Sequence, residues 1–149
     1  MAPADLRRDS IRERMNMATT IPPGKLIETH HDGHGLTESI IVLAADEVGP
    51  GGAHHRYDFA VQQNVGEPYV NVGYLQFQKG PRNEPGSTPG VLSVAVLAAL
   101  LDIHRAFQAG EFPSPENAEV IFHIEGAMDA LKRRADERAT RGVLGHNKI

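Results

Sequence analysis

Alternating apolar and polar positions in the middle of the chain predict a small β-sheet. Residues 37–45, 54–62 and 69–78 are rich in β-branched, aromatic and aliphatic side chains. In the second segment Tyr57 and its alternate neighbours are apolar, whereas Arg56 and its alternate neighbour are charged, as in a strand with one buried face. Clusters of glycine and proline separate the three segments. We therefore expect three strands joined by short turns in an antiparallel meander.

The last third of the chain has helical spacing instead and predicts a two-helix hairpin over about 89–108 and 115–140. Thr88 and Ser114 each stand directly before a proline. Their hydroxyls can accept from the free N–H groups at a helix start, and proline fits the first helical turn. The connector between the helices is so short that they must be antiparallel neighbours. Sheet and hairpin together predict the α+β class.

Two glycines stand where these helices should stop. Gly110 and Gly142 can each take the left-handed backbone of a helix C-terminus. The first helix is apolar on nearly all sides but too short to span a bilayer, which takes about 20 apolar residues. It therefore needs cover on more than one side, either from the sheet or from another copy of the chain.

The first 36 residues have a different character. Residues 5–16 are strongly charged, and Pro22-Pro23-Gly24 interrupts any continuing element. We expect residues 1–36 to form a poorly ordered arm or a short helix, followed by a single domain over 37–149. The arm is either a basic segment that binds a partner or a solvated leader. Its start lacks the apolar stretch of a signal peptide, so none is expected.

Composition narrows the possible functions. The chain has 149 residues, 40% of them hydrophobic, which suits one folded domain. It has no cysteine, which excludes disulfides, thiolate metal sites and a cysteine nucleophile. The formal net charge is −4 and the arginines are spread over both ends of the chain. A DNA- or RNA-binding protein would concentrate positive charge, so we expect no nucleic-acid polymer as a partner.

One histidine-rich segment has the chemistry of a metal site. His30, His31, Asp32 and His34 are all possible Zn²⁺ ligands. The alternative is a flexible glycine-rich loop, and adjacent histidines on a strand would point to opposite faces. No second ligand cluster with helical spacing accompanies them. We therefore expect neither a metal nor another cofactor.

Motifs in the hairpin carry a resemblance to a known family. The run from Leu100 to Ala118, which contains Phe-Gln-Ala-Gly-Glu-Phe-Pro-Ser-Pro-Glu-Asn, precedes Ala-Leu-Lys-Arg-Arg and the tail Arg-Gly-Val-Leu-Gly-His. These motifs resemble the phage hairpin domain that the first Thoeris anti-defence family shares with the second anti-CBASS family. Upstream, His55-Arg56-Tyr57-Asp58 and the run 77–81 resemble the Thoeris type. The resemblance covers roughly residues 53–149.

The resemblance implies a non-enzymatic sponge for cyclic nucleotide immune signals. Such proteins bind the signal and hold it without cleaving it. The expected ligands are glycocyclic ADP-ribose isomers, with cyclic trinucleotides as a second class that the resemblance leaves open. By position, Phe107 corresponds to the stacking ring, Asn117 to a polar contact, and Arg134, or its neighbour Arg133, to an arginine of the site. Arg56 is a further candidate for a phosphate contact, and no catalytic residue is implied.

Each of these positions also has an ordinary structural explanation. An aromatic ring at a helix end can fill a core, Asn117 can assist the Ser114 cap, and late arginines suit the helix dipole. The sequence also departs from the relatives before the first helix, where they have Asn-Gly-Val and this chain has Pro89-Gly90-Val91. A different ligand specificity would follow if that asparagine contacts the ligand.

The resemblance also implies assembly. The relatives form hexamers, and we expect a homo-oligomer with sites between chains, acting in the host cytoplasm and without a membrane partner. Two rival functions remain open. One is a metal- or histidine-dependent phosphodiesterase acting on a cyclic nucleotide and using His54, His55 or the histidines near residue 30. The other is an oligomerisation hairpin that binds no small ligand.

Overall fold

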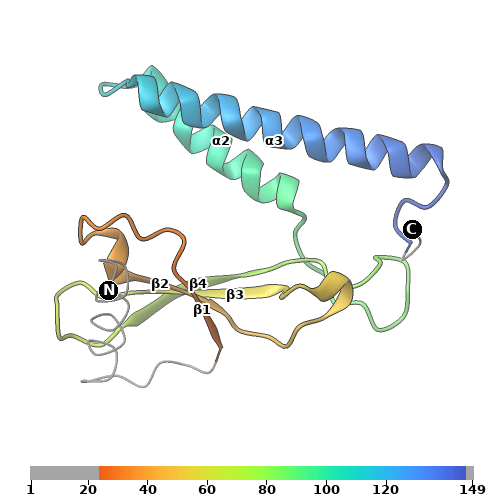
Figure 1. Cartoon of the computed structure of the whole chain (residues 1–149), viewed down its shortest axis with the longest axis horizontal. Helices are drawn as coiled ribbons and strands as arrows, with labels where there is room; N and C mark the ends of the chain where they lie inside the picture. Colours follow the sequence, from red (N-terminus) through yellow and green to blue (C-terminus); the bar gives the residue numbers. More distant parts are fainter. Residues whose placement is uncertain (1–23, 147–149) are drawn as a thin grey trace, which may run out of the picture. The chain divides into compact units, whose positions relative to one another are not determined.

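A computed structural model describes residues 24–146 of the chain. The chain divides into two compact units, residues 1–76 and 77–149, of which the first holds a β-sheet and the second two helices (Figure 1). Most of the predicted N-terminal arm, residues 1–36, lies outside the described residues. The predicted domain 37–149 spans the boundary between the two units.

The sheet unit confirms the predicted antiparallel meander and adds one strand to it. The four strands run in the order β1-β2-β3-β4, and every neighbouring pair is antiparallel. Their bounds are Lys25–Ile27 for β1, Ile40–Ala44 for β2, Arg56–Val61 for β3 and Val70–Gln76 for β4, with short 3-10 turns at Thr37–Ser39 (η1) and Pro50–Gly52 (η2). The three predicted strands correspond to β2, β3 and β4, whereas β1 lies within residues 1–36, where only a poorly ordered arm or a short helix was predicted. β1 has only three residues, too few for an alternating pattern to show.

The sheet core is small and centres on β2. Ile41 and Leu43 are buried, and Leu26 from β1 and Ala60 from β3 pack against them. The register sets Leu43 opposite Leu26 on one side and Asp58 on the other. Side chains opposite one another in adjacent strands share a face. The residues of β3 on the same face as the core are therefore those opposite Ile41 and Leu43, namely Ala60 and Asp58.

The helical unit confirms the predicted hairpin, with α2 at Ser93–Ala109 and α3 at Pro115–Thr140. The second helix has the predicted bounds. The Ser114 hydroxyl accepts from the Asn117 N–H at 3.0 Å, and Pro115 takes the first helical position. Gly142 follows the helix with φ +66°, the left-handed backbone that was predicted. Local start and stop signals therefore determine α3.

The first helix begins later than predicted. Thr88 does not cap it, since the N-cap is Leu92 and no side chain supplies a cap hydrogen bond. The Thr88 N–H and C=O instead pair with Lys79 at 2.8 and 3.0 Å, and the Val91 C=O accepts from the Gln78 N–H. These bonds keep the backbone before α2 extended, so the predicted start at residue 89 was wrong.

Gly110 also departs from its predicted role. Its φ is −88°, which is not the left-handed region, so the prediction of a left-handed stop was wrong. A Cβ placed on this residue would lie 3.2 Å from the Ala106 carbonyl oxygen. A larger residue would therefore be crowded against this carbonyl, whereas the backbone angle itself does not require glycine.

The C-terminal motif Arg-Gly-Val-Leu-Gly-His folds back on α3. The Arg138 guanidinium donates to the Val143 carbonyl at 3.2 Å and to the His146 carbonyl at 2.7 Å. Because one side chain satisfies two carbonyls beyond the helix end, the turn is held without a core of its own.

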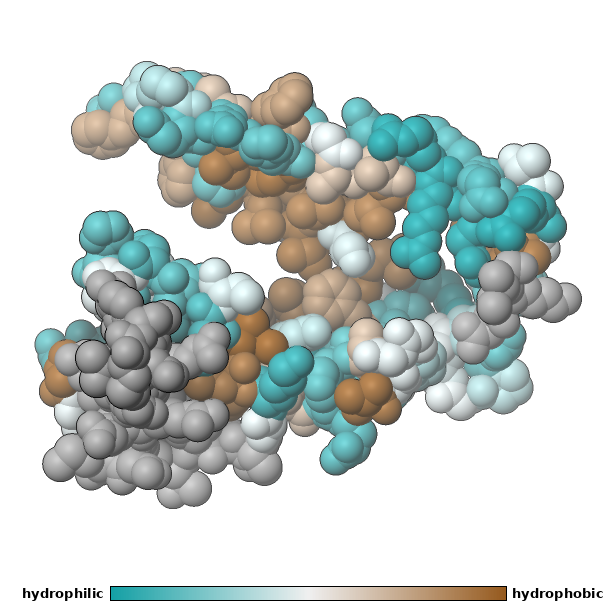
Figure 2. Space-filling view, viewed as in Figure 1, coloured by the Kyte–Doolittle hydropathy of each residue, from teal (hydrophilic) through white to brown (hydrophobic). Residues whose placement is uncertain are grey.

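The hairpin exposes much of its apolar surface. On α2 only Leu101 is buried, whereas Leu100 and Ile103 are exposed, and Phe122 of α3 is exposed as well. In Figure 2 the helical unit shows brown apolar surface along α2 and teal polar surface on α3. Among the helices within residues 24–146, none combines the length and apolar content needed to cross a membrane.

Candidate functional site

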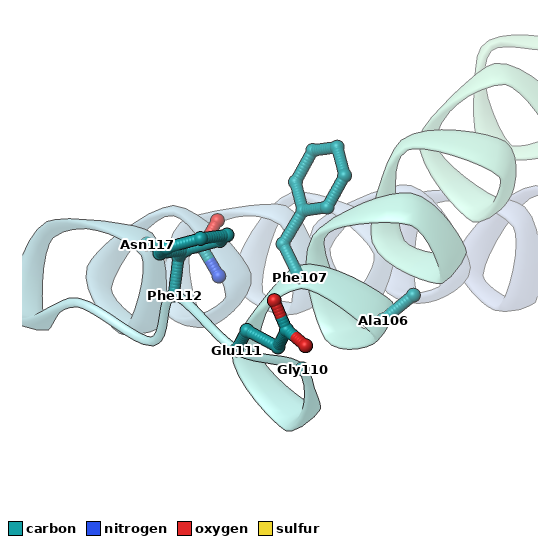
Figure 3. A pocket seen from close by; sticks show the side chains of 6 residues that line it. All are labelled: Ala106, Phe107, Gly110, Glu111, Phe112 and Asn117. Carbon is teal, nitrogen blue, oxygen red and sulfur yellow. The ribbon is translucent and has the colours of Figure 1, made fainter.

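The turn of the hairpin forms an open pocket (Figure 3). Its volume is about 330 Å³, and its walls come from the last turn of α2, the connector and the first turn of α3. The lining residues are Ala106, Phe107, Gly110, Glu111, Phe112 and Asn117. Of the four residues predicted from the sequence, the pocket brings together Phe107 and Asn117.

Two phenylalanine rings supply most of the apolar wall. Phe107, on the last turn of α2, is 55% exposed, and Phe112, in the connector, is 85% exposed. The His104 ring meets Phe107 edge to face, with 6.0 Å between the ring centroids. Phe107 therefore does not fill a core, the alternative considered above, but presents its ring to solvent at the pocket.

Asn117 is held by the end of α2. Its Oδ1 accepts from the His104 Nδ1 at 2.6 Å, and its Nδ2 donates to the His104 carbonyl and to Gln108 Oε1, both at 2.9 Å. Because the two acceptors fix the amide orientation, His104 must carry its proton on Nδ1. The backbone N–H of Ser114 also donates to Gln108 Oε1, at 3.3 Å. His104, Gln108, Ser114 and Asn117 thus form a polar clamp that joins the two helices at the pocket.

The sequence analysis did not select His104 and Gln108, the two members of this clamp on α2. His104 and Gln108 lie one turn apart on α2, and both reach toward the start of α3. The only available signal was their position, i and i+4 on a mostly apolar helix, beside a tight connector. Phe112 and Glu111 were quoted in the motif but not chosen as site residues.

Arg134 does not reach this pocket within one chain. It follows Asn117 by 134 − 117 = 17 residues on α3, which at about 1.5 Å per residue separates them by roughly 26 Å along the axis. Its side chain is exposed and takes part in none of the hydrogen bonds or ion pairs of residues 24–146. One small nucleotide cannot touch both residues of the same chain.

Arg56 belongs to the sheet unit and has partners there. Its Nε donates to Asp58 Oδ1 at 2.9 Å, and its guanidinium lies 4.4 Å above the centre of the Tyr74 ring. The side chain keeps 43% of its surface exposed, so donors remain available to an anion. The cation–π contact with the ring and the ion pair with Asp58 together hold the guanidinium in place.

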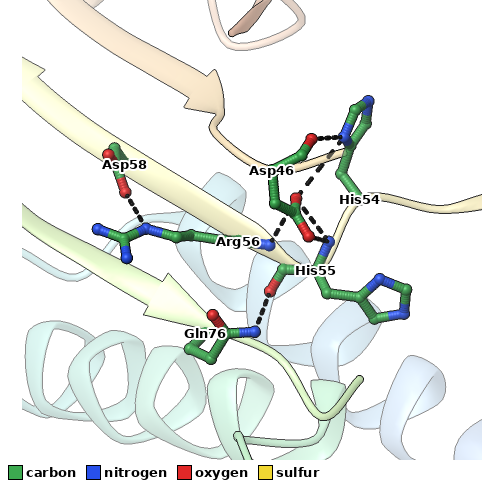
Figure 4. A network of polar contacts seen from close by, with 6 residues as sticks. All are labelled: Asp46, His54, His55, Arg56, Asp58 and Gln76. Carbon is green, nitrogen blue, oxygen red and sulfur yellow. Dashed lines mark hydrogen bonds and ion pairs between the residues drawn. The ribbon is translucent and has the colours of Figure 1, made fainter. Parts of the chain in front are cut away.

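A network of hydrogen bonds holds the backbone around Arg56 at the start of β3 (Figure 4). The Asp46 carboxylate accepts from the backbone N–H groups of His55 and Arg56 at 3.1 Å. The His54 Nδ1 lies 2.6 Å from the Asp46 carbonyl oxygen, and Gln76 Nε2 donates to the His55 carbonyl. The network anchors the backbone from which Arg56 projects, whereas the His55 Nδ1 is buried without a hydrogen-bond partner.

The histidine-rich loop before β2 is organised by its acidic residues. The Glu38 carboxylate accepts from the N–H groups of Gly33 and Gly35, and Asp32 Oδ1 accepts from the His34 N–H and the Thr37 hydroxyl. These bonds, first among them that from His34, lower the pKa of Asp32. Desolvation raises the pKa of Glu38, but the glycine N–H bonds outweigh it and lower that pKa overall.

These contacts engage two of the four candidate metal ligands, Asp32 and His30. His30 Nε2 lies 2.8 Å from the Ile40 carbonyl oxygen, so it acts there as a donor rather than a metal ligand. Within residues 24–146, no three His, Cys, Asp or Glu side chains converge in a way that could hold a metal ion. The loop is thus explained by its backbone hydrogen bonds.

The geometry therefore defines a protein of the α+β class whose candidate site is an open pocket with aromatic lining at the turn of a helical hairpin. No protein-family model matches the chain. A curated relative, Thoeris anti-defense 1 of Bacillus phage SBSphiJ7, is 39% identical over 75 residues. This similarity supports the assignment to the Thoeris anti-defence 1 family that the hairpin motifs predicted. The match covers 50% of this chain, and the chain spans only about half, 52%, of the relative's length.

Proposed function

We propose that this protein is a phage anti-defence sponge that binds cyclic nucleotide immune signals in the host cytoplasm and releases them unchanged. The observation that carries the proposal is the pocket at the hairpin turn. Its walls bring together Phe107 and Asn117, two of the three hairpin positions to which the family resemblance assigns ligand contacts. The name of the relative agrees with a role against Thoeris immunity.

The chemistry of the pocket suits binding better than cleavage. Glycocyclic ADP-ribose isomers present a flat base, ribose hydroxyls and phosphates, and a phenylalanine ring can stack on the base for about 1–3 kcal/mol. The six lining residues include no serine, histidine, cysteine or lysine, and the one group among them that could act as a base is the Glu111 carboxylate, with no hydroxyl or thiol among the lining side chains to activate. We therefore propose a ligand-binding role without catalysis, directed first at Thoeris signals and second at the cyclic trinucleotides of CBASS.

The proposal includes assembly, because one chain offers an incomplete site. A sponge must hold its signal at nanomolar concentration, which corresponds to about −12 kcal/mol. Such affinity usually requires a concave site that buries most of the ligand, whereas Phe107 and Phe112 line an open pocket. The roughly 26 Å between Asn117 and Arg134 supports a site in which Arg134 comes from another copy. The exposed apolar residues of α2 are the surface through which a homo-oligomer, a hexamer by family resemblance, would form.

Calorimetric titration with each glycocyclic ADP-ribose isomer tests the proposal. Phe107→Leu should weaken binding by about 5- to 150-fold, the factor that corresponds to one base–aromatic stack. Phe122→Leu is the matched control, because Phe122 is also exposed but lies on α3 outside the lining of the pocket. Equal affinity for the two variants would contradict stacking on Phe107. Absence of binding by the unaltered protein would refute this ligand class.

A further inference from the structure

The hairpin pocket contains aromatic rings and hydrogen-bond acceptors but no cation. Its polar side chains are the Glu111 carboxylate and the Asn117 amide, and no lysine or arginine is among the six lining residues. Figure 3 shows the rings of Phe107 and Phe112 around the same open space as the Glu111 carboxylate. A negatively charged wall of this kind repels a phosphate group.

The amide of Asn117 does not compensate for the missing cation. Both hydrogens of its Nδ2 are already used, one by the His104 carbonyl and one by Gln108 Oε1. What remains is a second lone pair on Oδ1, beside the bond from the His104 ring. Asn117 can therefore accept a hydrogen bond from a ligand but has no free donor for a phosphate oxygen.

The start of α3 is also poorly suited to an anion. Helix N-termini attract phosphates through free backbone N–H groups. Here the Asn117 N–H is bound to the Ser114 hydroxyl and the Ala118 N–H to the Ser114 carbonyl, while Pro115 has no N–H. The Ser114 N–H is itself bound to Gln108. Among the described residues, the Glu116 N–H is the one backbone donor of this helix start without a partner, and a single such donor is a weak phosphate site.

Phe112 has no structural explanation within one chain. It lies in the connector with 85% of its surface exposed, and exposure of a large ring to water is unfavourable. A second copy of the chain could cover it, but its position on the pocket wall, across from Phe107, also suits a flat ligand ring. The neighbouring Glu111 adds an acceptor for N–H or O–H groups at the edge of that ring.

We infer that this pocket takes the nucleobase end of the ligand, with Phe112 as a second stacking ring and Glu111 as the acceptor for the base amino group or a ribose hydroxyl. The inference rests on the proposed function and refines it, because it assigns the phosphates to groups outside the pocket. Phe112 and Glu111 become specificity-determining residues that favour a base bearing N–H donors.

The test uses the full chain, with glycocyclic ADP-ribose, adenosine and inorganic pyrophosphate as probes. Phe112→Ala should lose roughly 5- to 150-fold in affinity for both the cyclic nucleotide and adenosine, whereas Phe112→Tyr should retain it. Glu111→Ala should weaken adenosine binding, and Glu111→Gln should restore it because its amide oxygen still accepts. Pyrophosphate should not compete with adenosine. The melting temperature and the assembly mass should stay unchanged in all four variants.

The outcomes separate this inference from the proposed function. If the unaltered protein binds the cyclic nucleotide tightly but Phe112→Ala binds it equally well, the nucleobase assignment is wrong and the sponge proposal stands. Competition by pyrophosphate would also overturn the assignment. If adenosine binds through Phe112 while the cyclic nucleotide does not bind at all, the pocket assignment holds and the sponge proposal fails. An altered assembly mass in Phe112→Ala would instead show that Phe112 serves the contact between copies, which overturns the inference.

Discussion

Removal of the Asn117 side chain should destabilise the hairpin even when no ligand is present. Asn117→Ala deletes three hydrogen bonds of the clamp, one from the His104 ring and one each to the His104 carbonyl and to Gln108. At about 1 kcal/mol each, the expected loss is roughly 3 kcal/mol in the free energy of unfolding. At about 2–4 °C per kcal/mol for a chain of this size, the melting temperature should fall by roughly 6–12 °C.

Differential scanning calorimetry of the ligand-free protein measures this loss, and a double-mutant cycle locates it. Gln108→Ala removes the bond to Asn117 and the bond from the Ser114 N–H. The double variant should therefore lose less than the sum of the single losses, by about 1 kcal/mol. Strict additivity, or an unchanged melting temperature for Asn117→Ala, would show that the clamp does not hold the hairpin.

The structural role of Asn117 complicates the interpretation of binding experiments on variants of this residue. A loss of ligand in Asn117→Ala could follow from a distorted pocket rather than from a lost contact, because the same amide joins both helices. Phe107 gives the cleaner comparison, since more than half of its surface is exposed and it takes no part in the clamp.

Three further predictions concern stability. Ser114→Ala removes the cap of α3 and should cost about 1 kcal/mol, measured by urea denaturation, with no effect on β-sheet content. Leu43→Ala opens the buried sheet core and should cost about 2–5 kcal/mol by the same assay, and a smaller loss would mean that this site collapses easily. Asp32 and Glu38 have pKa values below their ordinary 3.8 and 4.5 when folded. Their stabilisation is therefore complete above about pH 4.5 and is lost as pH falls through the lowered values, so urea midpoints should drop on acidification. Replacement of both carboxylates by amides should flatten that dependence.

Local signals in the sequence predicted α3 well and α2 less well. Ser114-Pro115 and Gly142 lie at the ends of a pattern that nothing else in the chain disturbs, so the bounds of α3 followed directly. Thr88 carries the same type of signal before α2, yet its backbone pairs with Lys79, a tertiary bond that no local pattern reveals. Propensity at a helix start is a weak preference, and a pair of strand-like hydrogen bonds overrides it.

The candidate site was predicted in part. The resemblance selected Phe107 and Asn117, and the structure places both at one pocket. It could not reveal that His104 and Gln108 fix the Asn117 amide, because such contacts depend on how two helices cross. The separation of Arg134 from that pocket, by contrast, follows from 17 residues of spacing on one predicted helix. When residues of different copies form one site, the spacing of residues along a single chain does not indicate it.

The most direct test of the sponge proposal is the fate of the bound signal. The protein would be incubated with an equimolar amount of each glycocyclic ADP-ribose isomer, separated from free nucleotide and heated until it denatures, and the released nucleotide would be quantified by chromatography. Sequestration predicts that one isomer at least is retained in stoichiometric amount and recovered intact even after prolonged incubation. Recovery of a linear or otherwise altered nucleotide would show that the protein is an enzyme, and retention of none of the isomers would contradict the proposed ligand class.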